Sequence, residues 1–496
     1  MPSTLHPSRT KINNDASLVA HIARNHPDFS FSSEGIDLLW RCLYYYAYHP
    51  FPRNETTEER IDCNAFNRTL ALLVHDGTKL LGTQDNGAYL WRSHEDPKFI
   101  PQANFARVLR SIGRPDTSSP TSPGRHDSPS VLSDVMDVLA TTQPCSISQA
   151  PSVDQLDTTA RKLLSQEPPT PTRYRVSRQE VLLLATLVLR LRTSKAKWDQ
   201  TRQFGSLAPF EPADEVLATG ILQRIMPEDK EHDADELAST LFEHLPHLLL
   251  HFHQLWAVLF QPSRPNTNNV SVADATENSI PARVLSALSL FLPMGSSTTT
   301  TPRSSSNPRR VRFEKIDLPA DSAPTYTDLV NALQTGDNPH IILATNADRS
   351  QVIGALIPSP LWSTGADGRK RDCKVGNTHL LFQLGEEFRV LRWMNKPHTL
   401  LKTLIGMNGE EQSDAQKEPW TGPFYVGDMS KSSAARLEFD PEEKVVSLRG
   451  STGIADGSSD AAGYRDVLGS PKGPAARRDW EVVINASRVY VYSVLA

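Results

Sequence analysis

The chain has 496 residues, which is too long for one ordinary domain, so we expect two or three folded units. Only 38% of the residues are hydrophobic, and the 37 prolines outnumber the 25 glycines, which indicates folded blocks joined by disordered connectors. The net charge of −5 argues against a general attraction to nucleic acid or to anionic membranes.

The cysteines have no C-x-x-C spacing, which argues against a disulfide framework or a zinc site. They are Cys42, Cys63, Cys145 and Cys373. The first residues lack the apolar core of a signal peptide, and no segment has the long uncharged apolar run of a membrane span. We therefore expect a cytoplasmic protein that does not insert into a membrane, binds no nucleic acid and holds no cofactor or metal.

The N-terminal part is predicted to be a disordered tail at 1–30 followed by a helical block at 31–114. Residues 36–48 and 63–77 place apolar side chains three and four positions apart, as amphipathic helices do. A third helix is predicted at 103–112, and it ends the block.

Residues 115–175 are rich in Ser, Thr, Pro and Asp, so most of this segment is predicted to be a solvated linker. Two short amphipathic stretches interrupt it, at 131–139 and at 160–166. Each has enough apolar side chains to dock on a folded neighbour.

A second helical block is predicted at 176–293. Ser177 and Glu180 form the S-x-x-E pattern of a capping box, so a helix should begin there. Residues 234–260 are also strongly helical in pattern, with a break expected near Pro246.

Residues 279–293 predict one more helix, and 294–311 form a low-complexity loop. The segment 312–496 differs, because it contains many short β-branched and aromatic runs bounded by turn residues. The runs are 340–346, 350–358, 379–384, 388–393, 423–428, 434–440, 444–450 and 480–495. The predicted fold class is therefore α+β, with helical blocks followed by an antiparallel β-sandwich and with disordered linkers between them.

Two features resemble ligand sites, but we prefer a structural interpretation of both. His247 and His251 have the i, i+4 spacing of helical metal ligands, yet the sequence between them is HLLLH rather than H-E-x-x-H. We interpret them as histidines at the edge of a core. The glycine-rich stretch 450–463 lacks the G-K-[ST] of a phosphate loop, so we interpret it as a connection between strands. The arginines at 309, 310 and 312 are interpreted as solvated loop charges.

The adjacent carboxylates Glu386 and Glu387 separate two apolar, strand-like runs in HLLFQLGEEFRVLRW. Paired acid/base chemistry needs two carboxyls across one cleft, whereas neighbouring residues of a strand point to opposite faces. We therefore predict a hairpin turn after Gly385, with exposed glutamates that a protein partner contacts.

The order of motifs after residue 324 resembles a known family. IILATNADRSQ is followed by Ile353-Gly354-Ala355-Leu356 and then by Trp362, and GNTHLLFQL starts at Gly376. FRVLRW and the closing WEVVINASRVYVYSV complete the order. These pieces are similar to the Phe-Gly-Ala-Tyr and Trp opening, the Phe-Leu-Phe-Ser-Leu strand, the Val-Tyr-Lys-Trp strand and the final strands of the TLDc domain.

The resemblance implies a TLDc-type β-sandwich at 312–496, flanked by short helices and without an established catalytic centre. The residues that it places in the structural core are Gly354, Trp362, Gly376, Leu380, Phe382, Leu384, Trp393, Trp480 and Val491. The segment FNRTLALLVHDGTKLLGTQ near the N-terminus is similar to the helical extension of longer members of the family. Where the family has Gly-Glu before the Phe-Leu-Phe strand, this chain has Asn377-Thr378.

The function implied by the resemblance is that of a non-enzymatic regulator. It would bind the V-type ATPase of the vacuole or lysosome, influence the assembly of that enzyme and support resistance to oxidation, as a peripheral protein on the cytoplasmic side. Two alternatives remain open. One is a scaffold in nutrient signalling or in a process related to telomere capping. The other is a weak hydrolase or peroxide-handling enzyme that uses Glu386, Glu387 or Cys373.

Overall fold

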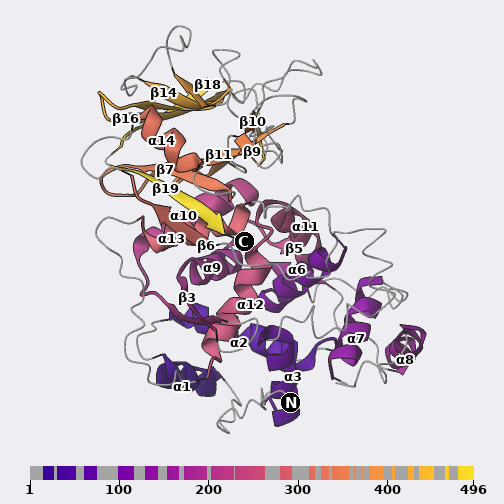
Figure 1. Ribbon diagram of the computed structural model, residues 1–496. Helices are drawn as coiled ribbons and strands as arrows, with labels where there is room; N and C mark the ends of the chain where they lie inside the picture. Colours follow the sequence, from indigo (N-terminus) through magenta and orange to yellow (C-terminus); the bar gives the residue numbers. More distant parts are fainter. Residues whose placement is uncertain are drawn as a thin grey trace. The chain divides into compact units, whose positions relative to one another are not determined.

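The structure is a computed structural model of the chain (Figure 1). It describes residues 15–26, 31–51, 61–74, 99–116, 129–142, 153–166, 173–197, 203–227, 229–262, 280–292, 312–318, 325–334, 338–357, 362–364, 370–372, 379–394, 405–407, 423–428, 435–451, 464–467, 479–486 and 488–495. The chain divides into two compact units. Unit 1 comprises Met1–Ala218 and Met226–Asp274, and unit 2 comprises Thr219–Ile225 and Ala275–Ala496.

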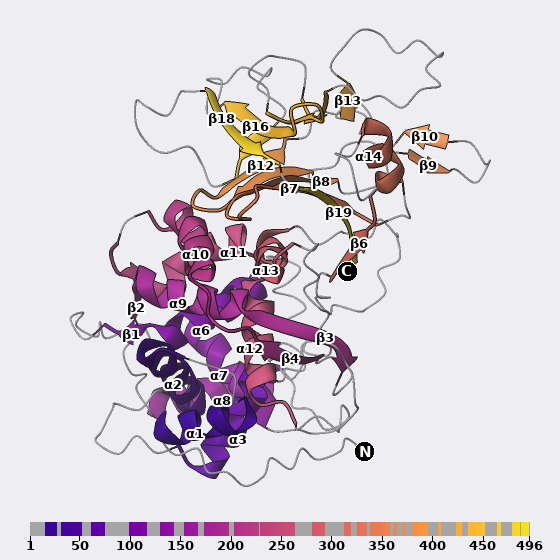
Figure 2. The same cartoon turned by 90° about the vertical axis from the view of Figure 1, so that its left-hand side faces the viewer.

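Unit 1 is mainly helical (Figure 2). Its helices are α1 (Asp15–Asn25), α2 (Ser33–Tyr48), α3 (Cys63–Val74), α6 (Phe99–Ile112), α7 (Pro129–Thr142), α8 (Val153–Gln166), α9 (Arg178–Leu189), the first half of α10 (Pro212–Ile225), α11 (Ala234–His244) and α12 (Leu248–Leu259). A small sheet joins β1 (Arg114–Pro115), β2 (Tyr174–Val176) and β5 (His232–Asp233), and β3 (Leu191–Lys197) pairs with β4 (Gln203–Leu207).

Local sequence signals account for the helix ends in unit 1. The predicted capping box is confirmed, because the Ser177 hydroxyl accepts a bond from the backbone N–H of Glu180 while the Glu180 carboxylate accepts one from the backbone N–H of Ser177. The predicted break near Pro246 is also confirmed, since α11 ends at His244 and α12 begins at Leu248. Proline has no N–H to donate and so cannot continue a helix.

The two amphipathic stretches predicted inside 115–175 are complete helices, α7 and α8, of 14 residues each. They pack on each other through one apolar cluster, which contains Leu132, Met136, Leu156 and Ala160. The Ser- and Pro-rich composition around them obscured their true length.

Unit 2 contains two antiparallel sheets, and with the helices of unit 1 they make the chain an α+β protein. The seven-stranded sheet has the order β17 (Tyr464–Asp466), β12 (Arg389–Trp393), β11 (Leu380–Leu384), β8 (Val352–Ile357), β7 (His340–Thr345), β19 (Arg488–Leu495) and β6 (Arg312–Ile316). The five-stranded sheet has the order β13 (Ile405–Met407), β14 (Phe424–Gly427), β15 (Arg436–Asp440), β16 (Val445–Ser451) and β18 (Asp479–Asn485). A separate hairpin joins β9 (Trp362–Thr364) to β10 (Lys370–Asp372), and the helices are α13 (Ala282–Phe291) and α14 (Tyr326–Leu333).

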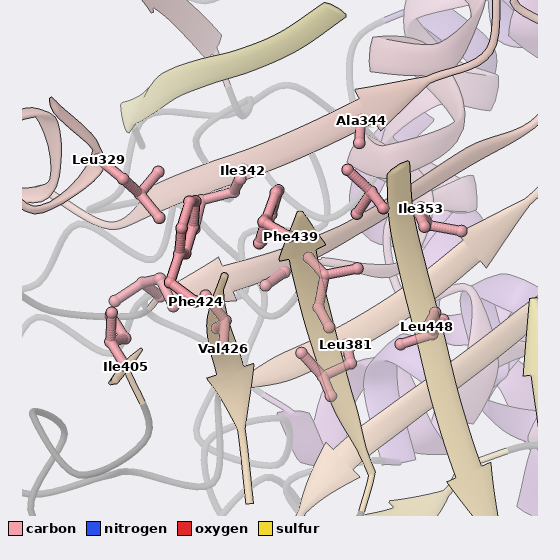
Figure 3. Packing of buried hydrophobic residues seen from close by; sticks show 14 of the residues in the cluster. Leu329, Ile342, Ala344, Ile353, Leu381, Ile405, Phe424, Val426, Phe439 and Leu448 are labelled. Atoms are coloured by element: carbon pink, nitrogen blue, oxygen red, sulfur yellow. The ribbon is translucent and has the colours of Figure 1, made fainter. Parts of the chain in front are cut away.

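The two sheets share one apolar core (Figure 3). Ile342 and Leu381 come from the seven-stranded sheet, whereas Phe424 and Leu448 come from the five-stranded sheet. The rings of Phe424 and Phe439 are stacked with their centroids 4.6 Å apart. Burial of these side chains is the main driving force that holds the layers together.

The seven-stranded sheet is buried on its second face as well. Leu380, Phe382 and Leu384 are buried there, opposite the face on which Leu381 lies. The ring of Phe291, from α13, meets Phe382 edge to face at 5.9 Å. Strands buried on both faces are continuously apolar rather than alternating, which explains the run LLF.

The residues assigned to a TLDc-type core therefore lie in different places. Trp393 and Val491 are in the core between the sheets, so they do not share a face with Leu380, Phe382 and Leu384. Gly354 is in β8, where an added Cβ would lie 2.3 Å from the carbonyl oxygen of Ile342, which only glycine avoids.

Three of these residues remain. Trp480 in β18 is half-buried against the core. Trp362 begins β9, and its backbone pairs with Asp372. Gly376 lies outside the described residues.

Candidate functional site

The predicted hairpin turn at Gly385-Glu386-Glu387 is confirmed. It connects β11 to β12, whose last pair across the turn is Gln383 and Arg389. Gly385 has a φ of +151°, a region that favours glycine. A Cβ at Gly385 would lie 2.8 Å from the carbonyl oxygen of Ser350, so this turn and the β7–β8 turn lie side by side.

Two helices, α10 and α13, contact the turn. A Cβ at Gly220, in the part of α10 that belongs to unit 2, would lie 2.2 Å from the carbonyl oxygen of Gly385 and 3.1 Å from that of Glu386. Phe388, which ends the turn, is buried and meets the Phe291 ring of α13 edge to face at 5.2 Å. The close approach of Gly220 and the ring contact of Phe388 together fix the position of the turn.

Both glutamate side chains are exposed, but they have different surroundings. The Glu387 carboxylate accepts bonds from Arg389 Nη2 at 2.6 Å and from Arg389 Nε at 3.1 Å. Glu387 lies in the turn and Arg389 begins β12, so this ion pair connects the turn to the strand.

Arg389 also contacts the other sheet. Its guanidinium carbon lies 4.1 Å from the ring centroid of Trp480, which is within the range of a cation–π interaction. The Trp480 ring covers Gly450, its partner across β16 and β18, where a Cβ would lie 2.5 Å from Trp480 Cζ2. Glu387, Arg389, Trp480 and Gly450 therefore form one continuous stack from the turn to the second sheet.

The neighbouring β7–β8 turn is organised by its own polar side chains. The Asp348 carboxylate accepts a bond from the backbone N–H of Ser350 at 2.9 Å, and this bond lowers the pKa of Asp348. Asn346 donates to the Ser350 hydroxyl at 3.0 Å and accepts from the backbone N–H of Gln351 at 3.1 Å. We call the exposed carboxylates of the two adjacent turns, Asp348, Glu386 and Glu387, the acidic tip.

The acidic tip suits binding better than acid/base catalysis. The carboxylates of Glu386 and Glu387 project from an exposed turn, and Glu387 is engaged by Arg389. A pair of catalytic carboxyls instead faces one substrate from opposite sides of a cleft. Cys373, the third residue considered for catalysis, lies outside the described residues.

The two histidines with the spacing of metal ligands lie in unit 1 and are buried. His247 and His251 are 8% and 4% exposed, and His253 Nδ1 donates to the Leu73 carbonyl at 2.9 Å. Among the described residues, no three His, Cys, Asp or Glu side chains gather closely enough to hold a metal ion. Burial raises the pKa of the Cys42 thiol to about 12, so it is protonated and unreactive at neutral pH.

The sequence interpretation missed a buried polar pair in unit 2. His379 Nδ1 is hydrogen-bonded to the Tyr464 hydroxyl at 3.0 Å, and Trp393 packs edge to face on Tyr464 with ring centroids 5.0 Å apart. Burial lowers the pKa of His379 to about 3 and raises that of Tyr464, so both side chains are neutral near pH 7. The signal in the sequence was a histidine that directly precedes the apolar run of β11.

Two arginine contacts were also missed. The Glu387–Arg389 pair was detectable, because it joins opposite charges only two residues apart in the sequence. The stack of Arg389 on Trp480 was not, since 91 residues of sequence separate them and only the sheet packing brings them together.

Neither protein-family models nor curated protein sequences match this chain. In the part of the chain that the structure describes, no helix is long and apolar enough to cross a membrane. The geometry of the site is therefore what supports a function.

Proposed function

We propose that this protein is a non-enzymatic regulator that acts by binding a large protein partner through the acidic tip of a TLDc-like β-sandwich. Two observations support a β-sandwich of the TLDc type. The order of the motifs from Ile353 to Val491 resembles that of the TLDc family, and unit 2 contains two antiparallel sheets that share one core.

The observation that carries the proposal is that the acidic tip is exposed and yet fixed in position. The turn has a backbone conformation at Gly385 that favours glycine, Gly220 lies against the turn, and Phe388 is buried. A surface that is already ordered loses little conformational entropy when it binds, so more of the contact energy appears as affinity. Exposed carboxylates on such a surface favour a partner with a basic patch, because opposite charges steer association.

The partner that we propose is the V-type ATPase, at the cytoplasmic face of the vacuole or lysosome. Its support is the family resemblance of the chain after residue 324. In this mechanism the sandwich and a helical arm contact the rotary stalk as a wedge, and this contact shifts the assembly of the enzyme. Resistance to oxidation would then follow from ATPase assembly rather than from chemistry on Glu386 or Glu387.

The test is affinity purification of the full chain from cell extract, under conditions that favour the assembled and the disassembled ATPase. The variant Glu386→Lys reverses one charge of the acidic tip without touching the Glu387–Arg389 pair. The matched control is Glu443→Lys, which reverses an exposed glutamate on the β15–β16 turn of the same unit.

We expect the unaltered chain and Glu443→Lys to recover ATPase subunits equally, and Glu386→Lys to recover about tenfold less, since a like charge at a complementary interface weakens binding. Failure of the unaltered chain to recover any ATPase subunit in either state would refute the proposed partner. Equal recovery by both variants would refute the acidic tip as the contact surface.

A further inference from the structure

Helix α7 carries a carboxylate into the interior of unit 1. Asp134 is only 5% exposed, and it lies in the amphipathic stretch 131–139 that is predicted to dock on a folded neighbour. It accepts bonds from Arg107 Nη2 at 2.8 Å and from Arg107 Nε at 3.3 Å. Its second oxygen accepts a bond from Arg110 Nη1 at 2.8 Å. One carboxylate is therefore bound by two guanidinium groups of α6.

The rest of the pocket around Asp134 comes from α2 and α3. His49 Nε2 is 3.8 Å from the carboxylate, but burial lowers the pKa of His49 to about 3, so this contact is not an ion pair near pH 7. The rings of Tyr45 and Tyr46 lie 5.1 and 6.3 Å from the His49 ring. Arg68 on α3 adds positive charge near His49.

The pocket is built for an anion. Arg107 is 4% exposed, and Asp134 is its partner in an ion pair. Arg110 divides its bonds between Asp134 and Asp235, which it meets at 2.7 Å. A buried guanidinium without an anionic partner is strongly unfavourable, so the pocket needs an acidic occupant.

Apolar side chains of α7 also pack on α8, in a cluster separate from the ion pairs with α6. The cluster of Leu132, Val135 and Met136 from α7 is completed by side chains of α8 and by Phe51. The α7–α8 pair thus has a small core of its own, while charged groups attach α7 to α6. Separation of the pair from the pocket would break the ion pairs and the Phe51 contact but would keep the contacts between α7 and α8.

We propose that the Arg107–Arg110 pocket is a recognition site for an acidic amphipathic helix of a partner protein, and that α7 occupies it in cis. The chemistry of the occupant is set by α7 itself: a helix that presents one carboxylate among apolar side chains. A partner helix of this type binds by displacing the α7–α8 pair. This inference concerns unit 1 and does not depend on the acidic tip or on the ATPase.

The first test is native-state hydrogen exchange of the unaltered full chain in low concentrations of urea, followed by mass spectrometry. We expect the amides of 129–166 to exchange through an opening that leaves α2, α6 and α12 protected, because cooperative subunits of a fold open separately. If 129–166 exchange only together with the rest of unit 1, the α7–α8 pair is not displaceable and the proposal fails.

The second test measures binding in trans. A fluorescent synthetic peptide of residues 129–166 is titrated into the full chain carrying Asp134→Lys, which places a cation against Arg107 and Arg110. The matched control chain carries Asp157→Lys, which alters a partly exposed carboxylate of α8 that pairs with Arg161.

We expect the peptide to bind the Asp134→Lys chain about tenfold more tightly than the control chain, in which α7 still fills the pocket. A peptide that carries Asp134→Asn should bind the Asp134→Lys chain with about tenfold lower affinity than the unaltered peptide. Equal affinity for both chains, or equal affinity of both peptides, would overturn the proposal. If circular dichroism shows that the Asp134→Lys chain is unfolded, the hydrogen-exchange result decides.

Discussion

The guanidinium carbon of Arg389 lies 4.1 Å from the ring centroid of Trp480, so a cation of the seven-stranded sheet stacks on an indole of the five-stranded sheet. The same guanidinium binds the Glu387 carboxylate. Contact between the layers at this edge is therefore polar and directional, whereas the centre of the core is apolar. The position of the acidic tip and the packing of the sheets are coupled through this one side chain.

Replacing Arg389 with alanine should lower the free energy of unfolding of unit 2 by about 1–2 kcal/mol, because the partly buried cation–π contact and its apolar stem are lost. Replacing Glu387 with glutamine should cost less than about 1 kcal/mol, since an exposed ion pair is weak and the stack remains. Urea denaturation followed by tryptophan fluorescence measures both. A larger loss for Glu387→Gln than for Arg389→Ala would show that the ion pair, not the stack, is the stronger contact.

Replacing Gly220 with alanine should destabilise the chain by about 1–3 kcal/mol, because the added carbon would overlap the Gly385 carbonyl oxygen at 2.2 Å. The matched substitution is Gly35→Ala in α2, where the added carbon would lie 3.4 Å from Ser32 Oγ, an ordinary contact. Alanine is the better helix former, so Gly35→Ala should be neutral or stabilising by up to about 1 kcal/mol. Thermal unfolding of the two variants tests the contrast, and equal effects would contradict the close approach of α10 to the turn.

Acid should destabilise unit 2 through His379. Burial lowers the pKa of His379 from its ordinary value of 6.5 to about 3, so the unfolded chain binds a proton more readily than the folded chain. The contribution of neutral His379 to the free energy of unfolding is fully present above pH 6.5 and is lost as the pH falls toward 3. Between pH 7 and pH 5 the free energy of unfolding should fall by about 2 kcal/mol.

The measurement for His379 is hydrogen exchange of peptides covering 379–393 at several pH values, corrected for the intrinsic rate of each. The variant His379→Phe should show a smaller loss of protection between pH 7 and pH 5 than the unaltered chain. Its Tyr464 hydroxyl loses a partner, so its stability at pH 7 should be lower. An unchanged pH dependence would show that other groups cause the acid sensitivity.

Replacing Asp134 with leucine should weaken the attachment of α7 by about 3–5 kcal/mol, because two guanidinium groups lose their shared partner inside the protein. The double variant Arg107→Met with Asp134→Leu should recover part of this loss, since apolar side chains of similar volume replace a buried ion pair at little cost. Exchange protection of 129–142 measures both. If the double variant is less protected than Asp134→Leu, the ion pair is not the main contact.

The sequence allowed local features to be predicted where one short pattern was enough. The Ser177–Glu180 capping box, the break near Pro246 and the turn at Gly385 depend on neighbouring residues only, and all three are confirmed. The type of the β-sandwich and the ATPase partner depend on a resemblance that nothing in the structure tests, so they stay predictions.

Features that depend on distant contacts were not predictable in this way. The run of Leu380, Leu381 and Phe382 is apolar at every position, so its pattern could not show that the strand is buried on both faces. Asp134 lies in the amphipathic stretch 131–139, whose pattern predicts docking but not a buried carboxylate, and only the arginines of α6 explain that burial. In both places a second element, absent from the local sequence, decides the environment.

In the acidic tip, the residues that fix the backbone differ from the residues that present charge. Gly220, Gly385 and Phe388 fix the backbone of the turn. The two glycines and the buried Phe388 ring fix the backbone without presenting a side chain at the surface, whereas the exposed Glu386 side chain takes no part in fixing it. Partner choice can therefore change by substitution at a single solvent-facing position while the loop keeps its shape. In engineering terms the tip is a graftable epitope, and new specificities can be selected from a library randomised at Glu386 alone.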